Sequence, residues 1–346
     1  MEPLPRENWN VRPFEARCVP MNVIDVRNDA AAVTVPQYLA DWLVHARGRV
    51  RAGTFEGYEG LIRCHALPHF EGMPLDELRP LHLQRLYADL MGQEGPELSA
   101  GTVLNLHLVL TQAFGQAVRW QLLASNPASG AQPPRPRRPP RPLVDTTLIK
   151  RLLHETHASW LEVPAAIAIA TGMRRGEILG LRWTDLDDGF TVARVQRTLQ
   201  PTRSGLVFEE PKTARSRRAV VLPTFIYPHL ERQRASQSSR REANPAEWDE
   251  HGLVIDRGDG RPLNPDTLSA GWARYLRHKE LPRVRFHDLR HGHATLMLTQ
   301  GVHPKVVSER LGHASIGITL DLYSHVLPSL QTEAATAFDQ LFPAAA

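Results

Sequence analysis

One stretch of the chain cannot form regular secondary structure, and it divides the rest of the sequence in two. Between Gln132 and Pro142, six of the eleven residues are proline and four are arginine, and none is acidic. Proline lacks a backbone N–H and fixes φ, so this density favours an extended, semi-rigid segment. We therefore expect a linker at residues 126–144, with a separate folded body on each side.

The arginines of this linker have two interpretations. A spacer between two domains needs no particular side chains, and the arginines would then be solvated surface residues. Alternatively, a basic strap would follow a nucleic-acid backbone, because guanidinium groups neutralise phosphates without reading sequence. The candidate DNA-binding residues of such a strap are Arg135, Arg137, Arg138 and Arg141.

Residues 33–125 carry helical periodicity in four segments. Each segment opens on residues that favour a helix start, namely Thr34 with Pro36, Thr54, Pro80 and Ser99. The fourth segment is the longest and ends before Asn126-Pro127, since the residue before proline avoids the helical region. Short connections between amphipathic helices predict a small bundle. Residues 1–32 show little periodicity and are interpreted as a tail or a partial module.

Residues 145–342 have the pattern of a mixed α and β domain. Short β-branched runs separated by turn residues predict a small antiparallel sheet, at Phe190 to Thr198, Leu206 to Glu209 and Ala219 to Leu222. Helical patterns flank them, whereas residues 232–250 are so polar that we expect a loose connector. Residues 330–342 have an apolar face and predict a C-terminal helix. The expected fold class is mainly α with a small antiparallel sheet (α+β).

The charge balance permits a polyanionic partner without requiring one. The chain has 41 Lys and Arg against 37 Asp and Glu, a net charge of +4. The basic residues form runs, at residues 47–51, 135–141 and 212–218. No stretch approaches the ~20 apolar residues of a membrane span, and the N-terminus lacks the apolar core of a signal peptide. We expect a cytoplasmic protein.

Residues suited to phosphodiester chemistry occur in order along the second domain. Arginine forks match two phosphate oxygens, and a lysine can protonate a leaving oxygen. A tyrosine with a pKa of about 10 is a weak nucleophile unless cations or a base assist it. Each residue alone has an ordinary surface or core role, but together they indicate attack on a phosphodiester without a metal. The candidates are Arg174, Lys212, His287, Arg290, His313 and Tyr323, with Glu177 placed to support Arg174.

The segment His287-Asp288-x-x-His291 permits another interpretation. It is similar to the metalloprotease pattern H-E-x-x-H with Asp in place of Glu, and histidines at i and i+4 can bind zinc. The positive charge of Arg290 on the same helix opposes a metal ion, and no third ligand is obvious, since His313 and His325 are only generic candidates. A zinc hydrolase is therefore a minor alternative, and we expect neither a metal nor another cofactor.

Taken in order, these motifs resemble the tyrosine recombinase (phage integrase) family over about residues 33–340. The resemblance implies a helical core-DNA-binding domain of the SAM-like kind, followed by a mixed catalytic domain of the tyrosine recombinase / type IB topoisomerase kind. The matching motifs are Thr171-Gly172-Met173-Arg174 with Glu177, Lys212 in a hairpin, His287-x-x-Arg290, Leu311-Gly312-His313 and Tyr323.

The resemblance also implies a role for each matching residue. The tyrosine would attack the scissile phosphate, giving a 3′-phosphotyrosyl link and a free 5′-hydroxyl. Arg174 and Arg290 would bind the non-bridging oxygens, and Lys212 would protonate the leaving 5′-oxygen. His287 would assist proton transfer from the tyrosine, and His313 would hydrogen-bond the phosphate.

For the whole protein, the resemblance implies a site-specific DNA recombinase that integrates or excises a mobile element. Its partners would be double-stranded DNA attachment sites, further copies of the chain in a homotetramer on DNA, and an accessory directionality factor. The helix at residues 330–342 would pass to the next subunit or pack on its own domain. Residues 1–32 are too short for a complete arm-site DNA-binding domain. Two alternatives stay open: DNA relaxation in the manner of a type IB topoisomerase, and a catalytically inert DNA-binding regulator.

Overall fold

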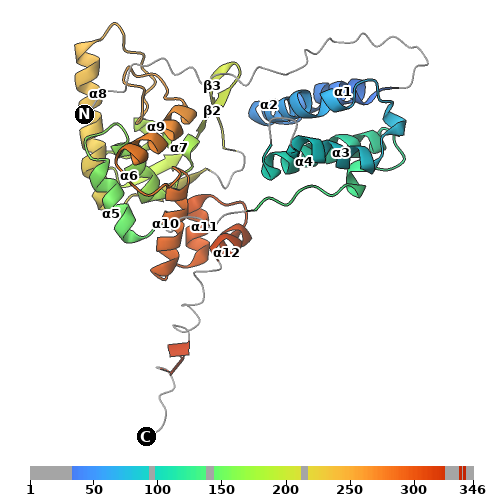
Figure 1. The fold of residues 1–346 in the computed structure, drawn as a ribbon. Coiled ribbons are helices and arrows are strands. Elements are labelled where there is room, and N and C mark those ends of the chain that lie inside the picture. Colours follow the sequence, from blue (N-terminus) through green and yellow to red (C-terminus); the bar gives the residue numbers. More distant parts are fainter. Residues whose placement is uncertain are drawn as a thin grey trace. The chain divides into compact units, whose positions relative to one another are not determined.

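The structure is a computed structural model that describes residues 33–92, 98–137, 144–211 and 217–323, together with residues 335, 336, 338 and 339. These residues fall into two compact units, which we name the N-terminal unit (residues 33–137) and the C-terminal unit (residues 144–339) (Figure 1). The predicted tail, the end of the linker and most of the predicted helix at residues 330–342 lie outside the described residues. The domain boundaries therefore stay predictions. In the described part, no helix is long and apolar enough to cross a bilayer.

Within the described residues of the N-terminal unit, the four predicted helices are confirmed. They are α1 (Val35–Arg47), α2 (Ala52–Leu61), α3 (Pro80–Met91) and α4 (Ala100–Arg119). The second begins two residues before the expected start at Thr54. α4 packs against the other three, and side chains such as Leu39, Leu86 and Phe114 form one apolar core. Burial of each such side chain stabilises the fold by about 1.5–3 kcal/mol. Between α2 and α3 the chain forms a π-helical turn at Ile62–Ala66 and 3-10 turns at Leu67–His69 and Leu75–Glu77.

Local hydrogen bonds determine where these helices begin and end. Thr34 and Gln37 form a capping box at the start of α1, in which each side chain accepts a hydrogen bond from the other residue's backbone N–H. α4 ends at Arg119 because Gln121 has a positive φ of 61° and its N–H bonds back to the carbonyl of Val118. The helix therefore stops well before the proline that the sequence marked as its limit.

The first part of the predicted linker packs on the N-terminal unit. The side chain of Asn126 caps a short turn, η4 (Pro127–Gly130), which lies against α3 and α4. Ala131, just beyond this turn, is buried in the core of the unit. Residues 132–137, which follow it, form no helix or strand, and the side chains of Arg135 and Arg137 are exposed. The proline density in the sequence indicated the part without helix or strand but not this packed start.

The C-terminal unit is built around α6 (Glu162–Thr171), all of whose residues are buried. It contacts α5 (Thr146–Glu155), α7 (Arg175–Leu179), α8 (Tyr227–Ala243) and α10 (Asp288–Thr299). The remaining helices are α9 (Pro265–His278), α11 (Pro304–Leu311) and α12 (Ile316–Tyr323), with short turns at Trp183–Asp185 and Thr224–Ile226. α11 contacts both α10 and α12, and Figure 1 shows these three helices together at one end of the unit.

The described strands form two separate antiparallel pairs, where the sequence predicted one sheet. β1 (Val192–Val195) pairs with β4 (Arg218–Val221), and β2 (Thr198–Thr202) pairs with β3 (Gly205–Glu209). The predicted run from Phe190 to Thr198 is interrupted at Gln196 and Arg197, where the chain leaves one pair and enters the other. The side chain of Arg197 forms an ion pair with Asp185 at this point. The fold is otherwise as expected, mainly helical with little sheet.

The prediction of a loose connector at residues 232–250 is wrong for residues 232–243, because α8 continues to Ala243. The buried face of α8 includes Gln233 and Gln237, so the apolar periodicity of a packed helix is absent from the sequence. Both amides donate from Nε2 to the backbone carbonyl of Val254, at 2.9 and 3.2 Å. These bonds satisfy the polar groups on burial, and the polar sequence therefore concealed a packed helix.

Candidate active site

The structure brings most of the predicted site residues to the C-terminal ends of α6 and α11. Arg174 immediately precedes α7, and Arg290 lies in the first turn of α10. His287 immediately precedes α10, and His313 follows the residue that caps α11. Hydrogen bonds between these elements, rather than proximity in the sequence, hold the group together.

Two predicted residues cannot be placed in this group. Lys212 lies in segment 212–216, outside the described residues, although Glu210 and Arg217 at the ends of that segment form an ion pair. Helix α12 ends at Tyr323, whose side chain also lies outside the described part. The roles of Lys212 and Tyr323 therefore stay predictions.

Both helix ends are closed by a glycine in the left-handed conformation. Gly172 ends α6 with a φ of 65°, and Gly312 ends α11 with a φ of 67°. A Cβ atom on Gly172 would lie 2.6 Å from the side chain of Leu311 and 2.7 Å from that of His293. Glycine is thus required at this position on both conformational and steric grounds.

The terminal carbonyls of both helices accept hydrogen bonds from arginines. Arg290 spans the two ends, donating from Nη1 to the Gly172 carbonyl at 2.6 Å and from Nη2 to the Leu311 carbonyl at 2.8 Å. Arg174 donates from Nη2 to the Gly312 carbonyl at 3.1 Å. Carbonyls in the last turn lack a partner inside their own helix and carry partial negative charge. This compensation permits the burial of Arg290, which is 4% exposed.

A single buried carboxylate, that of Glu177, binds two arginines. Its Oε1 accepts from Arg174 Nη1 at 2.7 Å and from Arg218 Nη1 at 3.2 Å. Its Oε2 accepts from the backbone N–H of Arg174 and from Arg218 Nη2, each at 2.9 Å. Burial alone would raise the pKa of Glu177, but the hydrogen bonds and charges of the two arginines outweigh it and hold the pKa below its usual value. Glu177 thus both holds Arg174 and caps α7.

Arg218 belongs to this cluster, although the sequence did not single it out. It begins β4 directly after Arg217, yet its side chain is 7% exposed against 57% for its neighbour. Besides binding Glu177, it donates from Nε to the carbonyl of Arg310 at 2.6 Å. In the sequence both arginines belong to one basic run, and only the inward and outward alternation of a strand could have separated them.

His293 and Arg310 form a second pair that the sequence did not single out. The Nδ1–H of His293 donates to the Ile169 carbonyl at 2.8 Å, so its Nε2 can accept from Arg310 Nε, 3.2 Å away. Arg310 also donates from Nη2 to the Ala170 carbonyl at 2.8 Å. Burial, and then the charge of Arg310, lowers the pKa of His293 to about 4. The neutral histidine thus joins α10 and α11 to the end of α6.

His313 lies beside the arginines and is neutral at pH 7. Burial, and then the charges of Arg290, Arg174 and Arg218, lowers its pKa to about 4. Its Nδ1 lies 2.8 Å from the hydroxyl oxygen of Thr319 on α12. A neutral imidazole carries one N–H, so the ring can donate one hydrogen bond at neutral pH.

The residues that a zinc site would require contact other side chains instead. His287 packs edge-to-face on His291, with ring centroids 5.1 Å apart. Desolvation of the ring, and then the charge of Arg290, lowers the pKa of His287. Asp288 accepts hydrogen bonds from Arg285 at 2.8 and 3.1 Å, so the carboxylate that would serve as a base in zinc chemistry is already bound to an arginine. Among the described residues, no group of three or more His, Cys, Asp and Glu could hold a metal ion.

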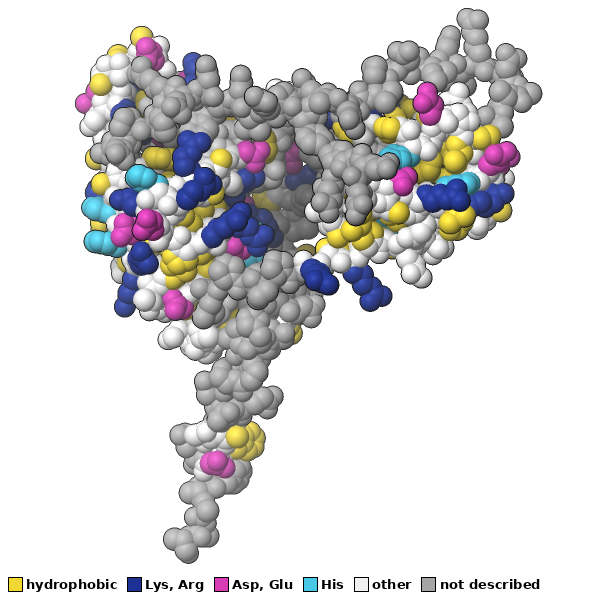
Figure 2. Space-filling view, in the orientation of Figure 1, with side chains coloured by type: hydrophobic (Ala, Val, Ile, Leu, Met, Phe, Trp, Pro, Cys, Tyr) yellow, Lys and Arg dark blue, Asp and Glu magenta, His cyan; other side chains and the backbone are white. Residues whose placement is uncertain are grey.

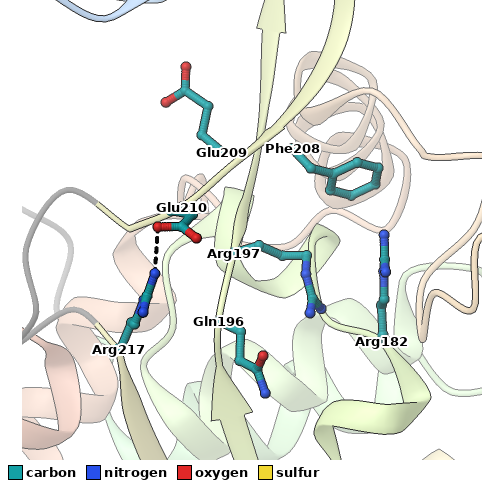
Figure 3. Close-up of a pocket in the computed structure, with 7 residues that line it drawn as sticks. All are labelled: Arg182, Gln196, Arg197, Phe208, Glu209, Glu210 and Arg217. Atoms are coloured by element: carbon teal, nitrogen blue, oxygen red, sulfur yellow. Dashed lines mark hydrogen bonds and ion pairs between the residues drawn. The ribbon is translucent and has the colours of Figure 1, made fainter.

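A pocket of 540 Å³ lies apart from this cluster, beside the residues that flank segment 212–216. Figure 3 shows its walls, which come from the β1–β2 connection, the end of β3 and the neighbouring chain. Two of its three arginines have acidic partners, since Arg197 pairs with Asp185 and Arg217 pairs with Glu210, and the third, Arg182, lies over the ring of Phe208. The arginines bound to helix-end carbonyls are therefore the better candidates for an anion site.

The cluster is suited to bind an oxyanion such as a phosphate. The side chain of Arg174 is 41% exposed, whereas Arg290 and the side chain of Arg218 are almost fully buried. Their guanidinium groups are oriented by fixed acceptors before any ligand binds, and preorganised donors of this kind stabilise negative charge that develops in a transition state. Figure 2 shows further Lys and Arg side chains grouped on the visible face of the C-terminal unit, where they would attract a polyanion.

Replacement of Arg218 by Gln tests the support that we assign to it. Removing one partner of a buried ion pair costs about 3–5 kcal/mol, and Glu177 would retain Arg174, so we expect a loss of about 3 kcal/mol. Arg217→Gln is the matched control, since its pair with Glu210 is exposed and should contribute less than about 1 kcal/mol. Urea unfolding followed by tryptophan fluorescence measures both, and equal losses would contradict the assignment.

Comparison with known proteins agrees with this architecture. The family model described as Phage integrase family matches residues 144–329, and that described as Phage integrase, N-terminal SAM-like domain matches residues 34–91. The Tyrosine recombinase XerC-like protein of Caldanaerobacter subterraneus is 30% identical over 335 residues, covering 91% of this chain and 85% of that protein. The ICEBs1 integrase of Bacillus subtilis is 26% identical over 319 residues, and the match covers 90% of this chain and 84% of that integrase.

Solved structures show the same fold. The integrase of transposon Tn1549, in complex with transposon right end DNA, has a TM-score of 0.74 at 22% identity and covers 90% of this chain and 100% of that chain. A lambda integrase tetramer bound to a Holliday junction has a TM-score of 0.62 at 16% identity and covers 85% of this chain and 78% of that chain. Because the first family model includes the whole arginine cluster and the second lies within the helical N-terminal unit, the chain belongs to the phage integrase family.

Proposed function

We propose that the protein is a site-specific DNA recombinase that cuts and rejoins DNA through Tyr323, to integrate or excise a mobile element. The observation that carries the proposal is the set of arginines fixed at the ends of α6 and α11, with His313 leading into the helix that ends at Tyr323. Membership of the phage integrase family supports it. The names of the relatives, recombinases and integrases of mobile elements, support the same chemistry.

The proposed reaction is a transesterification at one phosphodiester. The phenolic oxygen of Tyr323 attacks the scissile phosphorus, the bond to the 5′-oxygen breaks, and a 3′-phosphotyrosyl link forms. Arg174 and Arg290 neutralise the non-bridging oxygens, and Lys212 gives a proton to the leaving 5′-oxygen. The reverse attack by a 5′-hydroxyl rejoins the strand. One ester is exchanged for another, so the step needs no external energy source.

The histidines fit this scheme through their lowered pKa values. A neutral His287 can accept the proton that Tyr323 loses, and a protonated ring could not. His313, with a pKa of about 4, donates its one N–H to the phosphate without adding a further charge to the cluster. Both histidines would thus be neutral at neutral pH, which is the protonation state that each proposed role requires.

We also propose the assembly in which this reaction takes place. Double-stranded attachment sites would be bound by a homotetramer in the cytoplasm, and an accessory factor would set the direction of the reaction. The segment at residues 330–342 would pack on a neighbouring subunit. The exposed apolar side chains of Ile316, Ile318 and Leu320 on α12 support a protein contact at this end of the C-terminal unit.

Replacement of Tyr323 by Phe tests the nucleophile. A suicide duplex built from DNA that flanks the encoding gene should form a covalent complex with the wild-type protein, visible on a denaturing gel. The variant should bind the duplex but form no complex, because the attacking oxygen is gone. Tyr227→Phe is the control, since that tyrosine lies outside the cluster, and it should react like wild type.

Two results would contradict the assignment of Tyr323 as the nucleophile, and a third would favour a different function. A covalent complex that persists in the Tyr323→Phe variant would show that another residue is the nucleophile, and its complete absence with wild type would leave the inert regulator as the better interpretation. Relaxation of a supercoiled plasmid that lacks any such site would favour the topoisomerase alternative over recombination.

Replacement of the linker arginines by Gln tests the proposed basic strap. Arg135 and Arg137 are exposed, while Arg138 and Arg141 lie outside the described residues. If the four bind phosphates, the variant should bind all DNA sequences more weakly, and the slope of log K against log salt should become shallower by about 0.9 for each phosphate that the variant no longer neutralises. Binding assays over a salt series measure the slope, and an unchanged slope would show that the segment is only a spacer.

A further inference from the structure

The hydroxyl of Thr319 is the direct partner of His313. Thr319 lies on α12, four residues before Tyr323, and is 0% exposed. Its oxygen lies 2.8 Å from Nδ1 of His313. We propose that Thr319 is a positioning residue that donates its hydroxyl hydrogen to Nδ1 and so keeps the single N–H of His313 on Nε2.

The direction of this hydrogen bond is inferred from the acceptors open to a buried hydroxyl, and other threonines of the chain show the usual one. The hydroxyls of Thr111, Thr156 and Thr171 each donate to the carbonyl four residues earlier in their helix. Thr319 makes no such bond among the described residues, and its hydroxyl contacts His313 instead. A fully buried hydroxyl needs an acceptor, and the lone pair of a neutral imidazole nitrogen supplies one.

The proton position on His313 decides what the ring can do. Either nitrogen of a neutral imidazole can carry the hydrogen, and the bond made by one nitrogen fixes the state of the other. With Nδ1 accepting from Thr319, Nε2 is a donor and can bind an anionic oxygen. In the opposite tautomer, Nε2 would present a lone pair to that oxygen and repel it.

The positive charges around His313 favour a neutral hydrogen-bond partner over a charged one. The charged groups that act on the ring are Arg290, Arg174 and Arg218, from α10, the start of α7 and β4, and they disfavour a second proton. A carboxylate at position 319 would oppose them and favour the imidazolium. A hydroxyl fixes the tautomer without changing the charge, and it also ties His313 to the helix that carries Tyr323.

The inference rests on the proposed function, and Thr319→Val and Thr319→Ser test it. Valine keeps the shape of the side chain and removes the hydroxyl, whereas serine keeps the hydroxyl. With the suicide duplex in excess over its Kd, the valine variant should form the covalent complex about 10- to 100-fold more slowly, by analogy with the loss of the hydrogen-bond partner behind a metal-binding histidine. The serine variant should recover most of the rate, and the Kd for DNA should change little in either.

Two controls separate positioning from packing. Thr299→Val removes a hydroxyl of α10 that bonds only a backbone carbonyl, and it should keep the wild-type rate. In a His313→Gln background, Thr319→Val should have no further effect, because the residue acts through the ring. In addition, imidazole ¹⁵N shifts of the free protein should show His313 protonated on Nε2 in wild type and as a mixture of tautomers in Thr319→Val.

The outcomes that overturn the inference are distinct from failure of the proposed function. An unchanged rate in Thr319→Val, a serine variant as slow as the valine variant, or an equal loss in the His313→Gln background would each overturn it while wild type still cleaves. Absence of a covalent complex with wild type would overturn the proposed function and this inference together, whatever the nitrogen shifts show.

Discussion

Two helices that are far apart in the sequence end at the same place, and their terminal carbonyls are bound by arginines. The end of α6 supplies the carbonyls of Ala170 and Gly172, and the end of α11 supplies those of Arg310, Leu311 and Gly312. Burying a guanidinium costs several kcal/mol unless its charge and donors are compensated. Here the negative ends of two helix dipoles supply that compensation.

This arrangement explains how several like charges can share a small volume. Glu177 is placed between Arg174 and Arg218, and it alone could not offset the arginines around it. The helix ends do so without adding further carboxylates, which would compete with a phosphate for the same donors. Burial, together with the positive field that remains, lowers the pKa of His293 and of His313 and keeps both rings neutral. Structure and proposed chemistry thus depend on the same carbonyl groups.

Much of the molecule could be predicted from the sequence, and the exceptions have a common cause. Local signals such as the Thr34 cap determine helices, and the motif containing Arg174 and Glu177 is local as well. Arg218, His293 and Arg310 were missed because their roles depend on which helix ends meet in three dimensions. α8 was missed because its buried glutamines bind a distant backbone carbonyl instead of packing apolar surface. Non-local polar contacts leave no periodicity in the sequence.

The helix-end carbonyls and Glu177 hold the arginines in place before DNA binds. The most direct test is the exchange of guanidinium protons with water, measured by NMR in the DNA-free protein labelled with ¹⁵N-arginine. We expect slow exchange for Arg174, Arg218, Arg290 and Arg310, and fast exchange for Arg217, whose side chain is 57% exposed. If the other four arginines exchanged as fast as Arg217, the helix ends would not hold the cluster in the DNA-free protein.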